Sequence, residues 1–243
     1  MSDDEGHQRF DRGQAMQVLQ ALLRQLQRHR RLPQAPPFPA PASADERGCV
    51  AISTELTPEL VLEAYPQGLF PMVEPDGSFG WWSPDPRAVL ELDSVHVSRR
   101  LARRARSGRY EVRIDTAFDA VIRACAERDE TWISSEVRKA YTELHARGIA
   151  HSVESWEGER LAGGLYGVSL GGAFMAESMF HRETDAGKVA LLALVERLRA
   201  RDYLLCDIQY VTRATSVFEP LELPRERYLF RLAKALEVER SFV

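Results

Sequence analysis

The spacing of hydrophobic residues near the start of the chain predicts one amphipathic helix. Apolar side chains recur at helical spacing over residues 14–30, and a proline-rich run follows over residues 33–41. This pattern is typical of a tail helix on a stiff linker, so we expect a flexible tail over residues 1–45. The helix is either a dispensable extension or a docking element for a partner.

The next region predicts a small N-terminal domain over residues 46–83. Thr57 precedes Pro58, a combination that favours the start of a helix, and we expect this helix to end near Tyr65. The run Trp-Trp-Ser-Pro-Asp-Pro-Arg over residues 81–87 is locked by its prolines and cannot be helical. Its adjacent tryptophans suit either packing in a core or stacking on unpaired bases.

Residues 84–243 alternate between helical and strand patterns and predict a second domain. Two helices should come first, one capped by Asp115 or Thr116 and ending at Ala126, the other capped by Ser134 or Ser135 and ending at Gly148. Three strands then follow as an antiparallel meander, over residues 151–156, 159–170 and 173–180, with turns at residues 157–158 and 171–172. A helix after Asp185 leads to a buried strand over residues 203–210.

The last hairpin of the meander carries an acidic side chain in apolar surroundings. A regular register from the glycine turn places Tyr166 opposite Glu177, on the face that also holds Met175 and Met179. A carboxylate between two methionines is costly to bury without a partner. The partner is either a cationic group of a ligand or an internal arginine such as Arg182.

The buried strand that follows carries two polar residues. Its alternation puts Asp207 and Gln209 on one face, about 7 Å apart. They form either a buried hydrogen-bonded pair or a functional site. Meander, helix and strand together predict half of an acyltransferase core.

Charge and cysteine content narrow the class of protein. The 243 residues carry a net charge of −4, and no apolar run is long enough to span a bilayer, so we expect a cytoplasmic protein. Cys49, Cys125 and Cys206 have no paired spacing and are expected to be reduced. Arginines cluster in two places, over residues 24–31 in the tail and over residues 99–113, and they form either a polyanion site or a solvated helix face. The second cluster includes Arg99, Arg100 and Arg103.

Several long motifs resemble those of the leucyl/phenylalanyl-tRNA protein transferases. The resemblance covers about residues 55–225, and its most specific motif is the run over residues 81–87. The other motifs are Tyr-Pro-Gln-Gly-Leu-Phe-Pro at 65–71, Thr-Trp-Ile at 131–133, His-Ser-Val-Glu at 151–154, Gly-Gly-Leu-Tyr-Gly at 163–167, Glu-Ser-Met-Phe at 177–180 and Asp-Ile-Gln at 207–209. The resemblance implies an α+β protein, with a small N-terminal domain before a GNAT-like acyltransferase domain whose sheet is mixed and mostly antiparallel.

The family resemblance implies a tRNA-dependent peptide-bond former without a cofactor. Such proteins move leucine or phenylalanine from aminoacyl-tRNA to proteins with an N-terminal arginine or lysine and so mark them for degradation. Two alternatives stay open: a CoA-dependent GNAT acetyltransferase and a catalytically silent module that binds tRNA or N-termini. The segment from Phe180 to Lys188 lacks a glycine-rich phosphate loop, which argues against CoA.

The resemblance also implies roles for individual residues. Gln209 would contact the attacking amine, Asp207 would orient Gln209, and Glu177 would help to position the substrate or the terminal adenosine. An ionised Asp207 would also suit a cationic N-terminal residue. The implied aminoacyl pocket consists of Leu165, Phe174, Met179, Leu191, Leu194, Leu198 and Cys206. The implied contacts to the terminal adenosine are Tyr65, Trp132 and Tyr141.

Three departures from the family pattern alter the expected site. Met72 stands where the family has a tryptophan, and Leu194 and Leu198 partly replace aromatic residues of the pocket. The segment from Ala214 to Pro220 replaces a histidine and a Ser-Leu-Gly-Ala run beside the catalytic strand. Two consequences of the altered segment stay open, a shifted donor or acceptor preference and a loss of activity. No metal is expected, and the protein is predicted to be a monomer.

Overall fold

The structure, a computed structural model, describes residues 38–127 and 131–243. The predicted tail helix over residues 14–30 lies outside the described residues. Residues 38–243 form one compact unit. In the part of the chain that is described, no helix has both the length and the apolar character needed to cross a bilayer.

A three-stranded antiparallel sheet forms the first part of this unit. Its strands lie in the order β1 (Cys49–Ser53), β3 (Phe79–Trp82), β2 (Phe70–Val73). Between β1 and β2 lies α2 (Pro58–Ala64), which is followed by the 3-10 turn η2 (Tyr65–Gln67). The hydroxyl of Thr57 accepts a hydrogen bond from the backbone N–H of Leu60, which confirms the predicted cap. Trp81 and Trp82 are buried, so the core-packing interpretation holds rather than base stacking.

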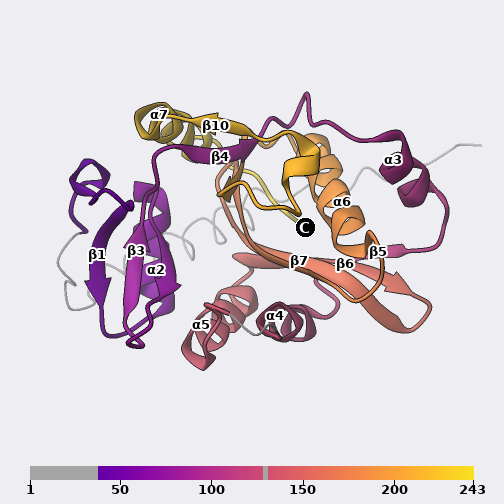
Figure 1. Ribbon diagram of the computed structural model, residues 1–243, viewed down its shortest axis with the longest axis horizontal. Coiled ribbons are helices and arrows are strands. Elements are labelled where there is room, and N and C mark those ends of the chain that lie inside the picture. Colours follow the sequence, from indigo (N-terminus) through magenta and orange to yellow (C-terminus); the bar gives the residue numbers. More distant parts are fainter. Residues whose placement is uncertain (1–37, 128–130) are drawn as a thin grey trace, which may run out of the picture. The chain divides into compact units, whose positions relative to one another are not determined.

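A seven-stranded mixed sheet forms the second part (Figure 1). Only its β8–β9 pair is parallel, and α6 (Ala186–Ala200) connects these two strands, which confirms the predicted order of meander, helix and strand. The α+β class with a mixed, mostly antiparallel sheet is likewise confirmed. The strands lie in the order β10 (Leu221–Leu223), β4 (Arg87–Leu90), β9 (Leu205–Gln209), β8 (Ala173–His181), β7 (Arg160–Leu170), β6 (Ala150–Glu157), β5 (Glu111–Ile114).

Helices cover both faces of the larger sheet and create two cores (Figure 1). On one face, α4 (Phe118–Ala126) and α5 (Ser135–Ala146) pack against β6 and β7, in a core shared with the smaller sheet. On the other face, α6 packs against β6 and β7 and contacts α3 (Arg99–Arg106). The remaining elements are α7 (Arg225–Leu236) and the 3-10 turns η1 (Pro41–Ser43) and η3 (Ser216–Phe218). The domain boundary between residues 83 and 84 stays a prediction.

The register of the meander differs from the prediction at two places. The first turn lies at residues 158–159, because Glu157 pairs with Arg160. In the second hairpin Leu170 pairs with Ala173 as predicted, but a β-bulge at Tyr166 and Gly167 places Tyr166 opposite Ser178 instead of Glu177.

The bulge changes which side chains share a face with Glu177. A Cβ atom at Gly167 would lie only 2.3 Å from the carbonyl oxygen of Met175, so the close approach of the strands at the bulge requires glycine. Met175 lies in the first core and Met179 packs against the second. The predicted position of Glu177 between two methionines on one face is therefore wrong.

The caps of α4 and α5 show what sequence spacing can and cannot predict. Ser134 caps α5 by accepting from the N–H of Val137, as predicted. Neither Asp115 nor Thr116 caps α4. Instead the buried carboxylate of Glu154, on β6, accepts from the N–H groups of Thr116 and Ala117, each at 3.1 Å. A carboxylate from a distant strand thus satisfies the helix N-terminus.

Candidate active site

A pocket of about 630 Å³ opens where the two sheets meet the end of β9. Its wall combines apolar side chains from β2, β7, β8 and α6 with polar groups from β8 and β9 and from the segment after β9. Its lining residues are Phe70, Met72, Ala124, Glu127, Trp132, Leu165, Ala176, Glu177, Ser178, Met179, Phe180, His181, Arg182, Leu191, Ile208, Gln209, Tyr210, Thr212, Arg213, Ala214 and Thr215.

Asp207 lies behind this wall in a buried ion pair. The guanidinium of Arg87, on β4, donates to both carboxylate oxygens, from Nε at 2.9 Å and from Nη2 at 2.6 Å. The Tyr228 hydroxyl donates to the same carboxylate at 2.8 Å. Asp207 is completely buried and its charge is neutralised by Arg87. The expectation that Asp207 receives a cationic N-terminal residue is therefore wrong.

Arg87 is held on all sides by the neighbouring elements. Its guanidinium carbon lies 4.6 Å from the ring centre of Phe70 and 4.5 Å from that of Tyr228. Its Nη1 donates to the carbonyl oxygen of Gly68 at 3.1 Å. A buried guanidinium with a bidentate carboxylate and two aromatic faces has little freedom to move. Asp207 is thus fixed in place.

Asp207 orients Gln209 through the backbone. The N–H of Gln209 donates to Oδ1 of Asp207 at 3.0 Å. Gln209 has a φ of 58°, in the left-handed region that non-glycine residues seldom occupy. The Asp207 carboxylate therefore stabilises the backbone conformation that turns Gln209 towards the pocket at the end of β9.

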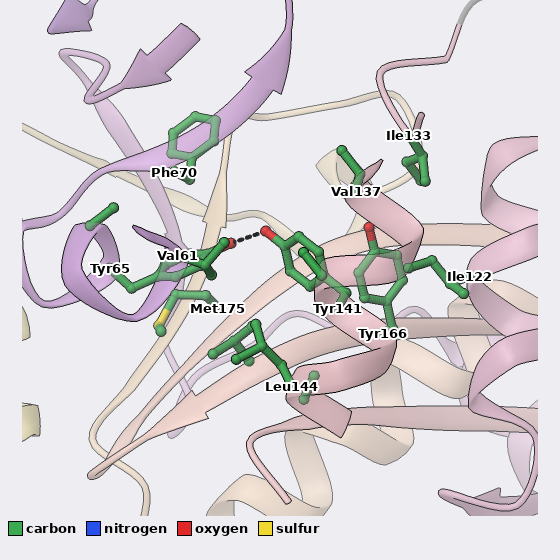
Figure 2. Close-up of a cluster of buried hydrophobic side chains, with 14 of the residues drawn as sticks. Val61, Tyr65, Phe70, Ile122, Ile133, Val137, Tyr141, Leu144, Tyr166 and Met175 are labelled. Atoms are coloured by element: carbon green, nitrogen blue, oxygen red, sulfur yellow. Dashed lines mark hydrogen bonds between the residues drawn. The ribbon is translucent and has the colours of Figure 1, made fainter. Parts of the chain in front are cut away.

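The side chain of Gln209 connects to a second carboxylate. Its Nε2 donates to Oε1 of Glu177 at 3.4 Å, and the Tyr141 hydroxyl donates to Oε2 of Glu177 at 3.3 Å. The hydroxyls of Tyr141 and Tyr65 lie 2.7 Å apart, as the dashed line in Figure 2 shows. Arg182, the internal partner considered for Glu177, instead pairs with Glu127 at 3.0 Å.

The surroundings of Glu177 shift its acidity into the neutral range. Part of its side chain is accessible from the pocket, but protein atoms surround it, and this burial raises its pKa to about 8. The negative charge of Asp207 raises the pKa further, while hydrogen bonds from Tyr65 and Tyr141 and the charge of Arg87 oppose the rise. Glu177 can therefore exchange a proton near neutral pH.

The residues predicted for the aminoacyl pocket divide into two groups. Leu165, Met179 and Leu191 line the cavity. The other four are completely buried in the second core behind it: Phe174, Leu194, Leu198 and Cys206. Leucine at the two substituted positions therefore affects the cavity through packing and not by direct contact.

The residues predicted to contact the terminal adenosine also differ in position. Trp132 is half-buried and lines the pocket, as does Met72 at the position of the family tryptophan. Tyr65 and Tyr141 lie in the first core, with exposures of 1% and 0% (Figure 2). Their hydroxyls point to Glu177 and to each other, so the structure connects both tyrosines to the carboxylate.

The arginine cluster lies on α3, apart from the residues that line the pocket. Arg99, Arg100 and Arg103 are all exposed. Arg100 makes a bidentate contact with Asp185, at 2.8 and 3.0 Å, just before α6. Both interpretations of this cluster, polyanion site and solvated face, stay open.

Two residues that hold Asp207 in place were not predicted as site residues. Arg87 is the last residue of the most specific motif of the sequence. It precedes the apolar run of a buried strand, and a charged residue in this position was a signal that could have indicated a site residue. Tyr228 lies on α7, with no local pattern to distinguish it. Among residues 38–127 and 131–243, no group of three or more His, Cys, Asp or Glu side chains could hold a metal ion.

Comparison with known proteins places this geometry in a family. Residues 89–233 match the family described as leucyl/phenylalanyl-tRNA protein transferase, and residues 54–85 match the N-terminal domain of that family. A leucyl/phenylalanyl-tRNA–protein transferase of Rubrobacter xylanophilus is 57% identical over 188 residues, which is 77% of this chain and 98% of the relative. One of Gloeobacter violaceus is 54% identical over 188 residues, with 77% and 97% coverage.

A third relative extends the match further along the chain. The leucyl/phenylalanyl-tRNA–protein transferase of Anaeromyxobacter sp. strain K is 50% identical over 212 residues, which is 85% of this chain and 91% of the relative. Fold and relatives together define an aminoacyltransferase. The chain belongs to the leucyl/phenylalanyl-tRNA protein transferase family.

Proposed function

We propose that the protein transfers leucine or phenylalanine from aminoacyl-tRNA to the α-amino group of acceptor proteins that begin with arginine or lysine. The observation that carries this proposal is one pocket in which an apolar wall faces the Glu177–Gln209 pair. Leu165, Met179 and Leu191 suit an unbranched-β apolar side chain of the donor. The product marks the acceptor for degradation, and we place the protein in the cytoplasm as a monomer.

The reaction needs placement more than activation, because an aminoacyl ester already reacts with amines. The Nε2 group of Gln209 is engaged by Glu177, which fixes the orientation of the side-chain amide. Its Oε1 atom is then the acceptor that can hold the attacking amine. An amide oxygen is too weak a base to remove the proton, so Gln209 acts by orientation.

Glu177 is the group suited to carry the proton. Its pKa of about 8 is close to that of a peptide α-amino group, about 7.7–8.0. The amine nitrogen attacks the ester carbonyl carbon and its proton passes to the Glu177 carboxylate. The bond between that carbon and the ribose oxygen then breaks, and the ribose oxygen takes the proton from Glu177. Ester and amine become amide and hydroxyl, with Glu177 regenerated.

Residues at the rim of the pocket suit the tRNA end of the donor. Trp132 offers an aromatic face to the terminal adenosine, and the exposed Arg213 lies on the same rim, where its charge suits a phosphate. The exposed cluster of Arg99, Arg100 and Arg103 is a second candidate contact for tRNA. The segment from Ala214 adjoins this rim, so its departure from the family pattern affects how the aminoacyl-tRNA donor binds.

The CoA-dependent alternative is disfavoured by the start of α6. The N-cap residue of α6 is Asp185, whose nearly buried carboxylate pairs with Arg100. A pyrophosphate at this helix N-terminus would require N–H groups free of negative charge, and the carboxylate lies at that position. A Cβ atom at Gly163 would lie 2.7 Å from the backbone nitrogen of Gly187, so α6 packs tightly against β7 at this point.

The decisive experiment measures transfer of radiolabelled leucine or phenylalanine from charged tRNA to peptides that begin with arginine, lysine or alanine. Wild-type protein should label the two basic peptides, and Glu177→Gln and Gln209→Ala should reduce the rate of labelling by at least about a hundredfold. Folded wild-type protein that labels none of the peptides would contradict the proposal. Thermal stabilisation by acetyl-CoA would favour the acetyltransferase instead. Binding of tRNA without transfer, unchanged by Asp207→Ala, would favour a silent binding module.

A further inference from the structure

The pocket contains few groups that could receive the cationic side chain of an acceptor. Two carboxylates belong to its described lining, Glu177 and Glu127, and Asp207 lies behind the wall. Asp207 is completely buried and its oxygens are occupied by Arg87 and Tyr228. A side chain entering the pocket would have to displace a buried guanidinium to reach it.

Glu177 is also unsuited to hold a cation. Its oxygens accept from Gln209 and Tyr141, and its position beside Gln209 commits it to the reacting amine. Because burial raises its pKa to about 8, it is mostly protonated at neutral pH and offers little negative charge. A protonated carboxylic acid carries no negative charge, so it binds a cationic side chain poorly.

Glu127 is an accessible carboxylate of the pocket that can hold a cation. It directly follows α4, lines the same pocket and leaves 62% of its side chain exposed. An exposed carboxylate that accepts a hydrogen bond from a guanidinium has the geometry needed to bind a cationic side chain. Its present partner is Arg182 at 3.0 Å, which also lines the pocket. A guanidinium thus already occupies the position next to Glu127 that an arginine side chain of a substrate would take.

We propose that Glu127 forms the subsite for the cationic side chain of the acceptor's first residue, and that Arg182 is an internal occupant which this side chain displaces. The inference rests on the proposed function, because the α-amine of the same residue must lie at Gln209. It specifies which carboxylate distinguishes arginine and lysine from neutral N-terminal residues.

The exchange of guanidinium groups is energetically feasible. An ion pair between two exposed side chains contributes little to the stability of a protein, so Arg182 is readily displaced. The Arg182 guanidinium also lies 5.5 Å from the ring centre of Phe180, which offers it a second contact after displacement. The incoming side chain is tethered to the amine bound at Gln209, which raises its effective concentration at Glu127.

Binding of peptides that begin with arginine or citrulline tests the subsite without requiring transfer. Citrulline has nearly the shape of arginine but carries no charge. Wild-type protein should bind the arginine peptide about fivefold more tightly than the citrulline peptide, and Glu127→Gln should reduce this ratio to about one. Arg182→Gln should increase the ratio, because the competing internal guanidinium is gone. Glu46→Gln, at an exposed glutamate outside the pocket lining, should leave the ratio unchanged.

The outcomes distinguish this inference from the proposed function. If Glu127→Gln keeps the preference for arginine over citrulline, the subsite lies elsewhere and the inference fails even when transfer occurs. If wild-type protein shows no preference, the inference fails as well. If Glu127→Gln abolishes the preference while no peptide is labelled from charged tRNA, the subsite stands and the proposed transfer fails.

Discussion

Two carboxylates of one site show how surroundings determine what an acid does. Asp207 meets a guanidinium that donates to both of its oxygens, within a frame of aromatic rings. Glu177 meets neutral donors, the amide of Gln209 and the hydroxyls of Tyr65 and Tyr141. The first arrangement holds a fixed charge, whereas the second leaves an acid whose pKa burial raises to about 8.

This difference assigns different work to the two acids. Asp207 does not line the pocket, and it contacts Gln209 through the backbone, so the proposed function makes it a positioning residue. Glu177 lines the pocket and can gain or lose a proton near neutral pH, so it can take part in the reaction itself. If either acid could replace the other, the two would not have different roles.

Removing the cation from Asp207 should have the largest effect. Arg87→Met leaves a buried carboxylate without its partner, and this should lower the free energy of unfolding by about 3–5 kcal/mol. Transfer activity should be lost as well, because the backbone of Gln209 depends on Asp207. Urea denaturation monitored by tryptophan fluorescence measures the stability change.

The double variant Arg87→Met/Asp207→Leu separates charge from packing. It removes both members of the ion pair, so much of the stability should return while transfer stays absent. If Arg87→Met alone unfolds at the same urea concentration as the wild type, the ion pair does not hold the site together, and the contrast between the two acids is lost.

Replacing the proton-exchanging acid should change how stability depends on pH. Because the folded-state pKa of Glu177 is raised to about 8 from an ordinary value of 4.5, the folded state binds its proton more tightly than the unfolded state. Its contribution to stability is fully present below about pH 4.5 and is lost as the pH rises to about 8. As the pH rises through this range, ionisation of Glu177 should lower the free energy of unfolding by roughly a few kcal/mol.

Glu177→Gln should remove that part of the pH dependence. The variant should be less sensitive to pH than the wild type between about pH 5 and pH 8, with the stability difference in its favour largest at the alkaline end. Chemical denaturation repeated across this range measures the difference. Parallel pH profiles for variant and wild type would show that Glu177 has no raised pKa.

Local patterns predicted much of the fold because they depend on neighbouring residues. The cap at Thr57, the cap at Ser134 and the glycine turn before Ala173 are all set within a few positions of sequence. The predicted alternation of Asp207 and Gln209 is interrupted at Gln209, because its φ of 58° departs from the regular geometry of a strand.

The rest of the site depends on contacts between distant segments. Arg87 reaches Asp207 across 120 positions of sequence, and the carboxylate of Glu154 caps a helix 37 positions away. The bulge at Gly167 moves Glu177 off the predicted face because two strands approach closely there. Periodicity assumes a regular ladder, so it cannot indicate an inserted residue. Asp207 is inaccessible to ligands because of contacts with distant residues, and the local sequence pattern does not show these contacts.

The smallest expected effect concerns one donor to Glu177. Tyr141→Phe removes the hydroxyl that donates to its carboxylate, which weakens the ionised form and should raise the Glu177 pKa further. At neutral pH transfer should fall by about threefold to tenfold, and the pH at which activity reaches half its maximum should rise by about half a unit to one unit. Tyr203→Phe, whose hydroxyl bonds to Ser169 instead, is the matched control. A lower activity with an unmoved pH midpoint would mean that Tyr141 acts by packing, and that neutral donors do not set the acidity of Glu177.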